Sequence, residues 1–355
     1  MSASNLLNRN IKLDILRITA CFLIIMSHVS SGVADMTNVT ADWYISHIYN
    51  TLGHTGTILF LFISGTLLLN KDYDFKAKKF YSKNFLRLLV AYILWIIIYH
   101  IIGFIQRGNW GYVYVKDVII NVIKGEAGYH FWYVPMLLGL YLILPMLRAI
   151  TGAGQKLVKY FVLLFVVTEL IFGTVKMFDF PYKYLLISLF DRIPLTLVET
   201  YAGYFVMGYF LSLLLQQKKI THPRITGGIC LVTGVLLGVA GDRFITHQQQ
   251  SSSIAMNSLF SLTLCLAAVG IYILNSAFTY SGVAAEGVVR ISRITFGVYM
   301  IHPLIISGIN AFQLLQHIPS IAGIPLLSLV VFIVSYICIR ILALIPFIRK
   351  WFLYA

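Results

Sequence analysis

Long apolar runs recur along the whole chain, and they constrain its fold more than any other feature. A helix needs about 20 mostly apolar residues to cross the hydrocarbon core of a bilayer. Ten segments approach this requirement. Their approximate ranges are 13–32, 50–70, 85–105, 131–150, 157–177, 195–215, 225–240, 254–275, 294–313 and 324–348. We therefore expect an all-α, polytopic transmembrane helix bundle of about ten spans, with residues 1–355 forming a single domain.

The composition supports this class and argues against others. Only 11% of the residues are charged and 59% are hydrophobic, whereas an average soluble domain carries about 25% charged residues. The four cysteines all lie in apolar stretches without the paired spacing of a metal site, so we expect packing residues rather than disulfides or metal ligands. No metal and no permanently bound cofactor are expected. Nothing in the sequence indicates an oligomeric state.

The lysines and arginines are concentrated on one side of the expected bundle. Seventeen of the 27 lie in the segments on the same side as the N-terminus, and seven lie in the loops on the other side. Because short cytoplasmic loops carry an excess of basic residues, both termini are predicted to be cytoplasmic. This pattern also explains the net charge of +14, so nucleic-acid binding is not indicated. The expected location is the plasma or inner membrane, as a multi-pass protein.

The first apolar run, DILRITACFLIIMSH, keeps three ionisable residues, Asp14, Arg17 and His28. The eleven helical steps from Arg17 to His28 end within roughly 20° of the same direction and about 16 Å further along the axis. Asp14 and Arg17 are spaced for an ion pair at i,i+3, and His28 could simply bond a neighbouring helix. A polar side chain at such depth more often marks a ligand path, so Arg17 and His28 are candidate functional residues.

Other candidate residues are assigned by their depth in the expected spans. Ser64 precedes Gly65 near the inner end of the second span, where a pair of small residues indicates close helix packing more than a nucleophilic serine. Aromatic residues at the outer mouth of the fourth span are typical of an interfacial aromatic belt. With an acid and a histidine beside them, they are also suited to binding a sugar. The candidates on the acceptor side are Glu126, His130, Trp132, His54 and His302.

Lys83 and Arg87 are candidates for binding a phosphate. They are spaced i,i+4 at the start of the third span, so both side chains lie on one face of a helix. Two cations on one face can hold a phosphate group. The positive-inside pattern accounts for the other basic residues of this segment.

Four segments together resemble the acyltransferase 3 family of membrane acyltransferases. Its signature is an arginine and a histidine separated by ten residues in the first span, which Arg17 and His28 match. FLFISGTLL, HFWYVPMLLGLYLILPML and ISRITFGVYMIHPLI resemble the segments of its second, fourth and penultimate spans. The likeness covers essentially the whole chain. The family often has an Arg-x-x-Arg pair at the start of the third span, where this chain has Asn84 and Arg87, with Lys83 adjacent.

The resemblance implies transfer of an acyl group from a cytoplasmic acyl-CoA, usually acetyl-CoA, to a hydroxyl of a glycan or lipid-linked saccharide at the outer face. His28 would be the general base and Arg17 would anchor the donor or stabilise developing negative charge, while Arg87, Lys83 and Ser64 would contact the donor. The soluble domain that some members append is not expected here. A secondary transporter or a polysaccharide export partner is the alternative, because intramembrane Arg, His and Glu also form transport paths.

The orientation is directly testable. A cysteine introduced at Ser252 in a cysteine-free background should react with a membrane-impermeant maleimide in intact cells, because the 248–253 loop is predicted to be external. A cysteine at Ser82 should react only after the membrane is permeabilised. Labelling in the opposite pattern would overturn the predicted orientation.

Overall fold

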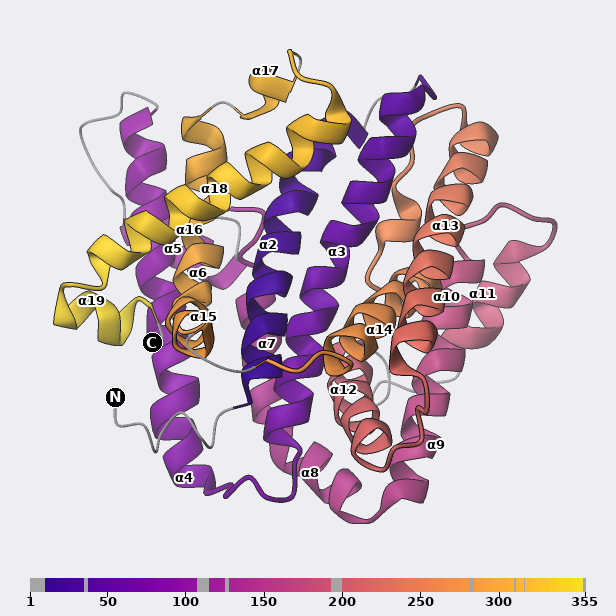
Figure 1. The fold of residues 1–355 in the computed structure, drawn as a ribbon, viewed down its shortest axis with the longest axis horizontal. Helices are drawn as coiled ribbons and strands as arrows, with labels where there is room; N and C mark the ends of the chain where they lie inside the picture. The colour runs from indigo at the N-terminus through magenta and orange to yellow at the C-terminus, as the bar shows by residue number, and fades with distance from the viewer. Residues whose placement is uncertain are drawn as a thin grey trace.

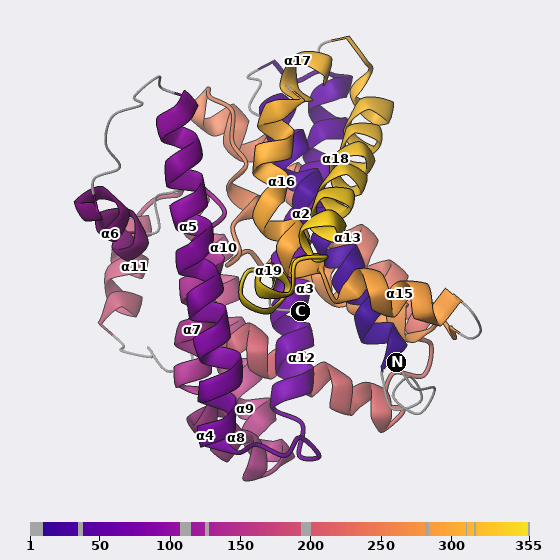
Figure 2. The same ribbon diagram turned by 90° about the vertical axis from the view of Figure 1, so that its left-hand side faces the viewer.

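The structure is a computed structural model of the chain, and it describes residues 10–34, 38–106, 115–124, 128–192, 200–280, 284–309, 311–315 and 317–353. Within these ranges the ordered elements are helices, and no strand occurs. Figures 1 and 2 show long helices packed side by side, with the short helices α17 (Ala311–Leu315) and α4 (Ala77–Phe80) at opposite ends of the bundle and α6 (Val115–Lys124) and α11 (Lys183–Asp191) at its side. The all-α class expected from the sequence is confirmed.

The helices follow one another along the chain with few interruptions. The first half contains α2 (Ile11–Ala34), α3 (Ala41–Leu68), α4 (Ala77–Phe80), η1 (Tyr81–Phe85), α5 (Leu86–Gln106), α6 (Val115–Lys124), α7 (Tyr133–Leu142), α8 (Leu144–Gly152), α9 (Gln155–Phe165), η2 (Val166–Ile171) and α10 (Phe172–Val175). The second half contains α11 (Lys183–Asp191), α12 (Tyr201–Gln216), α13 (Pro223–Gln249), η3 (Ala255–Asn257), α14 (Leu262–Ser276), α15 (Ala284–Ser292), α16 (Thr295–Gly308), α17 (Ala311–Leu315), α18 (Ser320–Leu342) and α19 (Pro346–Trp351).

Among the described residues, six helices are long and apolar enough to cross a membrane, and up to eight if each of two bent pairs counts as one span. The bent pairs are α7 with α8, at 56°, and α15 with α16, at 62°. Pro145 lies in the first turn of α8, where its missing N–H breaks no helical hydrogen bond. The chain is thus a multi-pass membrane protein. The count of ten stays a prediction, because α12 and α14 are apolar but shorter.

The seventh and eighth expected segments have different limits in the structure. The seventh, 225–240, is the 27-residue helix α13, which continues through the polar residues Asp242 and Arg243 to Gln249. The eighth, 254–275, begins as a helix only at Leu262, because residues 255–257 form the separate short turn η3. At about 1.5 Å per residue, the 15 residues of α14 cover about 22 Å, less than the roughly 30 Å core of a bilayer.

Helices α2 and α3 pack against each other at the centre of the bundle (Figure 1). Two glycines of α3 make this contact close. A Cβ atom on Gly53 would lie 2.5 Å from the backbone nitrogen of Ser27, and one on Gly56 would meet the carbonyl of Ala20. Small residues let helix backbones approach in this way, so the two helices that carry Arg17, His28, His54 and Ser64 form one unit.

Helix α12 approaches the other side of α3 equally closely. A Cβ atom on Gly65 would meet the carbonyl oxygen of Phe205, and one on Gly208 would meet the backbone of Phe62. The close-packing role considered for the Ser64–Gly65 pair is therefore confirmed for Gly65. Ser64 remains available for another role.

Gly65→Ala should destabilise the protein, because its methyl group has to displace the backbone of α12. Overpacking of this kind typically costs about 1–3 kcal/mol, so the apparent melting temperature of the detergent-solubilised protein should fall. Gly139→Ala is the matched control, since nothing lies within 4 Å of a Cβ atom at that helical position. Equal melting temperatures for the two variants would contradict the close approach of α3 and α12.

Candidate functional site

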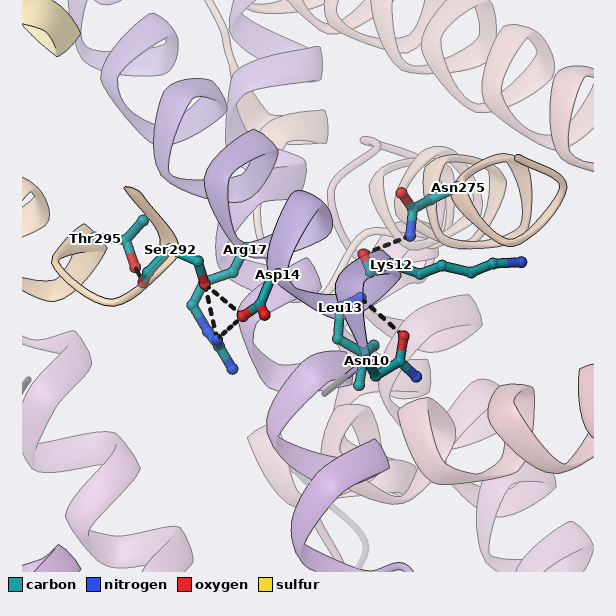
Figure 3. Close-up of polar contacts among 8 residues, drawn as sticks. All are labelled: Asn10, Lys12, Leu13, Asp14, Arg17, Asn275, Ser292 and Thr295. Atoms are coloured by element: carbon teal, nitrogen blue, oxygen red, sulfur yellow. Dashed lines mark hydrogen bonds and ion pairs between the residues drawn. The ribbon is translucent and has the colours of Figure 1, made fainter. Parts of the chain in front are cut away.

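Arg17 is fixed on α2 by two neighbours. Its Nη1 atom donates to Oδ1 of Asp14 at 2.9 Å and to Oγ of Ser292 at 3.0 Å. Ser292 in turn donates to the same Asp14 oxygen at 2.6 Å, so the three groups form a closed triangle (Figure 3). The ion pair expected from the i,i+3 spacing is therefore present. The Asp14 side chain is 3% exposed and that of Arg17 is 25% exposed, so only the arginine faces open space.

That space is a cavity of about 550 Å³. Helices α2, α3, α5, α7, α15 and α16 surround it, together with η1. Arg17, Ser64 and Asn84 contribute polar groups to its wall, and Tyr133 and Tyr299 contribute rings. The volume suits a small organic ligand or part of a larger one.

The charge of the cavity is positive. Arg293 also lines it, and no aspartate or glutamate does. Asp14 offsets the charge of Arg17, but Arg293 is exposed and has no ion-pair partner in the part of the chain that the structure describes. Guanidinium groups bind phosphate and carboxylate through two parallel hydrogen bonds. The cavity is therefore suited to an anionic ligand.

Two tyrosines connect the cavity wall with a group of histidines. The rings of Tyr133 and Tyr299 lie 5.7 Å apart, and the Tyr299 hydroxyl donates to the carbonyl oxygen of His130 at 2.5 Å. The Tyr299 ring is also 5.7 Å from the rings of His130 and His302. Tyr299 therefore lies both on the cavity wall and beside the histidines.

Four histidines from four separate segments gather beyond the tyrosines. The His28 ring stacks on His302 with centroids 5.3 Å apart, and His130 lies 5.7 Å from His302. His54 of α3 is close enough to His28 for an electrostatic interaction. The structure thus brings together His28 and three of the residues that the sequence assigned to the acceptor side.

Several nitrogens of this cluster have no partner. His302 Nδ1 lies 2.5 Å from the carbonyl oxygen of Tyr299. Nδ1 therefore carries the proton and Nε2 presents a lone pair. This buried Nε2 atom and both ring nitrogens of His130 lack a hydrogen-bond partner among the described residues. Buried polar groups are usually paired, so the cluster has hydrogen-bonding capacity that the described residues do not use.

The cluster does not have the arrangement of a metal centre. In the described ranges, no group of three or more His, Cys, Asp or Glu side chains could hold a metal ion. The rings of His28 and His302 stack with centroids 5.3 Å apart, and the His130 ring meets that of His302 edge-on at 5.7 Å. Proton transfer and hydrogen bonding are the chemistry that this arrangement supports.

A buried polar network fixes the turn of α2 that carries His28. The side-chain nitrogen of Asn50 donates to the Ser27 carbonyl at 3.1 Å and to the Ser30 hydroxyl at 3.1 Å. The Asn50 oxygen accepts from the Asn257 side chain at 2.7 Å, and the Asn50 carbonyl lies 2.9 Å from Nδ1 of His54. Asn50 therefore connects α2, which carries His28, and α3, which carries His54, with the η3 turn.

Other predicted site residues lie outside the cavity and the cluster. Lys83 is exposed, and Arg87 donates to the carbonyl oxygen of Lys350 at 3.1 Å. Neither lines the cavity, although Asn84 between them does. Trp132 is 40% exposed, with its ring 5.8 Å from that of Tyr201. Glu126 lies outside the described residues.

Sequence reasoning missed Arg293, Tyr299 and Asn257. In the sequence Arg293 is one of the basic residues of the predicted inner side, and nothing local marks its position beside the bend between α15 and α16. Tyr299 precedes His302 by three residues, a spacing that places both on one helix face, so it could have been found. Asn257 sits in a short turn whose partner, Asn50, is 207 residues away.

A family model described as "Acyltransferase domain" (Acyl_transf_3) matches residues 10–340, nearly the whole chain. The chain therefore belongs to this acyltransferase family, and it is an acyltransferase. The resemblance inferred from the four sequence segments is confirmed. Comparison with curated proteins and with solved structures gave no match.

The Asn50–Asn257 pair should stabilise the fold as a unit. Asn50→Ala and Asn257→Ala should each lower the apparent melting temperature, because each leaves a buried partner without its hydrogen bond. Since the residues contact each other, the double variant should lose less than the sum of the two single losses, with a coupling of about 0.5–3 kcal/mol. Strictly additive losses would show that the two amides do not interact.

Proposed function

We propose that this membrane acyltransferase moves an acyl group from a cytoplasmic acyl-CoA, with acetyl-CoA as the simplest donor, to a hydroxyl of a glycan or lipid-linked saccharide at the outer face. The observation that carries the proposal is the pairing of an arginine-lined cavity with a histidine cluster. Helix α2 contributes Arg17 to the first and His28 to the second. Helix α16 likewise contributes Tyr299 and His302. One pair of helices thus joins an anion site to a proton-transfer site.

The donor is assigned to the cavity. Coenzyme A carries several phosphates at one end and its thioester at the end of a long flexible arm. Arg293 and Arg17 are suited to the anionic end, and Ser64 and Asn84 offer further hydrogen bonds. Arg87 and Lys83 remain proposed as additional phosphate contacts, adjacent to Asn84. The arm would then extend past Tyr133 and Tyr299 towards His28.

The reaction assigned to the histidine cluster is a direct acyl transfer. His28 takes the proton of the acceptor hydroxyl while the hydroxyl oxygen attacks the thioester carbonyl carbon. The new C–O bond forms and the C–S bond breaks, and the proton passes from the imidazolium to the departing thiolate, which gives an ester and free CoA. The unpartnered Nε2 of His302 and the nitrogens of His130 would orient the acceptor, with His54, Trp132 and Glu126 as further acceptor-side candidates.

Membership of the acyltransferase family favours this function over the secondary transporter or export partner that the sequence left open. The orientation follows from the basic residues of the loops, which put the Arg17 end of α2 on the cytoplasmic side. The donor would thus approach from inside, and the acceptor would meet the histidines from outside. The plasma or inner membrane remains the proposed location.

His28→Gln should lower acyl transfer by about 10²–10⁴-fold, the typical contribution of a positioned general base, while donor binding stays near normal. Transfer is measured as the radioactivity that inverted membrane vesicles incorporate from labelled acetyl-CoA. Donor binding is measured as the rise in melting temperature of the solubilised protein with acetyl-CoA. Substantial transfer by a well-folded His28→Gln protein would exclude the base role and direct attention to His302 or His130.

Arg293→Gln provides the opposite comparison in the same two assays. It should weaken donor binding by about tenfold, as expected for loss of a charge-assisted hydrogen bond, with a smaller effect on the rate at saturating donor. If acetyl-CoA leaves the melting temperature of the unaltered protein unchanged, the assignment of the cavity to an acyl-CoA fails.

A further inference from the structure

A second cavity, of about 680 Å³, opens between the first turn of α2 and the adjoining ends of α12, α13 and α14. It shares no wall residue with the Arg17 cavity. Figure 3 shows the separation: Asp14 and Arg17 turn towards Ser292 on one side of α2, whereas Lys12 lies on the other side, where its carbonyl bonds to Asn275. Nothing in the proposed acyl transfer uses this second space.

The wall of the second cavity carries positive charge. Lys12 and Lys218 line it, and no aspartate or glutamate does. Lys12 is held in place, since its Nζ donates to the Ser276 carbonyl at 2.6 Å and its own carbonyl accepts from Asn275 at 2.9 Å. An ammonium group has three donors, so this hydrogen bond leaves donors for a ligand.

A helix N-terminus adds to this charge. Thr221 and Pro223 line the cavity, and Pro223 is the first residue of the 27-residue helix α13. The first turn of a helix has N–H groups without intrahelical partners and carries about half a positive charge. Two lysines and a helix N-terminus therefore converge on one space, which favours a phosphate group.

The wall of this cavity also has apolar residues, and an apolar stripe begins nearby on α13. Leu215 and Ile220 belong to its wall. Two residues after Pro223, α13 begins a stripe of exposed apolar side chains at i, i+4, i+7 and i+11. This stripe consists of Ile225, Ile229, Val232 and Leu236, which are 57–62% exposed. Large apolar side chains on the outer face of a helix that can span a membrane are suited to acyl chains.

We propose that this cavity binds the phosphate-bearing headgroup of an anionic phospholipid, with the acyl chains along the Ile225–Leu236 stripe of α13. Basic pockets between membrane helices on the cytoplasmic side are known to hold such headgroups. The predicted orientation puts the first residue of α2 and the last residues of α12 and α14 on that side. The site is separate from the donor cavity, so it does not depend on the proposed acyl transfer.

The test uses the full chain in a neutral detergent. Phosphatidylglycerol should raise the apparent melting temperature in a concentration-dependent way, because a ligand that binds only the folded state stabilises it. Phosphatidylcholine with the same acyl chains should have little effect. An equal shift with both lipids would overturn recognition of the anionic headgroup.

Two neighbouring lysines give a matched pair of variants. Lys218→Gln should raise the dissociation constant for phosphatidylglycerol by about fivefold, the effect of removing one cation worth roughly 1 kcal/mol near an anionic lipid. Lys219→Gln should not change it, because Lys219 is exposed but does not line the cavity. Both lysines are exposed at the end of α12, so both variants should fold. Equal affinities in the two variants would place the lipid elsewhere.

Soluble phosphate compounds test whether the bound phosphate group belongs to a lipid or to a soluble molecule. Inorganic phosphate and CoA should not reproduce the stabilisation that depends on Lys218, because neither offers acyl chains to α13. If CoA stabilises the protein and Lys218→Gln abolishes that effect, the cavity binds a soluble nucleotide and the lipid proposal is wrong. If CoA stabilises the protein equally in both variants, the donor site lies outside this cavity, as proposed.

Discussion

The close approach of α2 and α3 is the contact on which the rest of the site depends. Gly53 and Gly56 let the two backbones meet along the segment from Ala20 to Ser27, and the Asn50 amide then bonds across the same interface. In a bilayer, helices gain little from apolar burial alone, so packing of small residues and polar bonds between helices must hold them together. Both devices occur in the stretch of α3 that includes His54, and they position His28 opposite it.

The sequence allowed part of this site to be predicted and not the rest. The shared face of Arg17 and His28 follows from helical periodicity alone, and so does the Asp14–Arg17 ion pair. The meeting of His28, His54, His130 and His302 could not be derived, because it depends on how four segments pack. The spacing of residues along one helix determines which of them lie close together, so such contacts can be predicted. Contacts such as that of Asn50 with Asn257, 207 residues apart, cannot be predicted from spacing.

The same distinction explains where the fold departed from expectation. The apolar runs located the helices, because composition determines which segments can leave water. The lengths of the helices were predicted less well than their positions. Helix α13 continues through Asp242, whose carboxylate accepts the Met256 N–H at 2.8 Å, and this contact accompanies the η3 turn that shortens the following helix. A polar residue read in isolation suggests the end of a span, but Asp242 accepts a hydrogen bond from the η3 turn that directly follows α13, 14 residues along the chain.

Charged and neutral polar groups lie at different positions along α2. At its first turns, Arg17 is tied to Asp14 and Ser292, so it presents part of its guanidinium to the cavity without being an isolated buried ion. About 16 Å further along the helix, the cluster consists of imidazoles, which can remain neutral in an apolar setting and still exchange a proton. The tyrosines between them carry hydroxyls and no charge at neutral pH. Under the proposed function, an anionic donor would be held at one end of α2 while its thioester reacts at the other, in a region where free phosphates would be costly to desolvate.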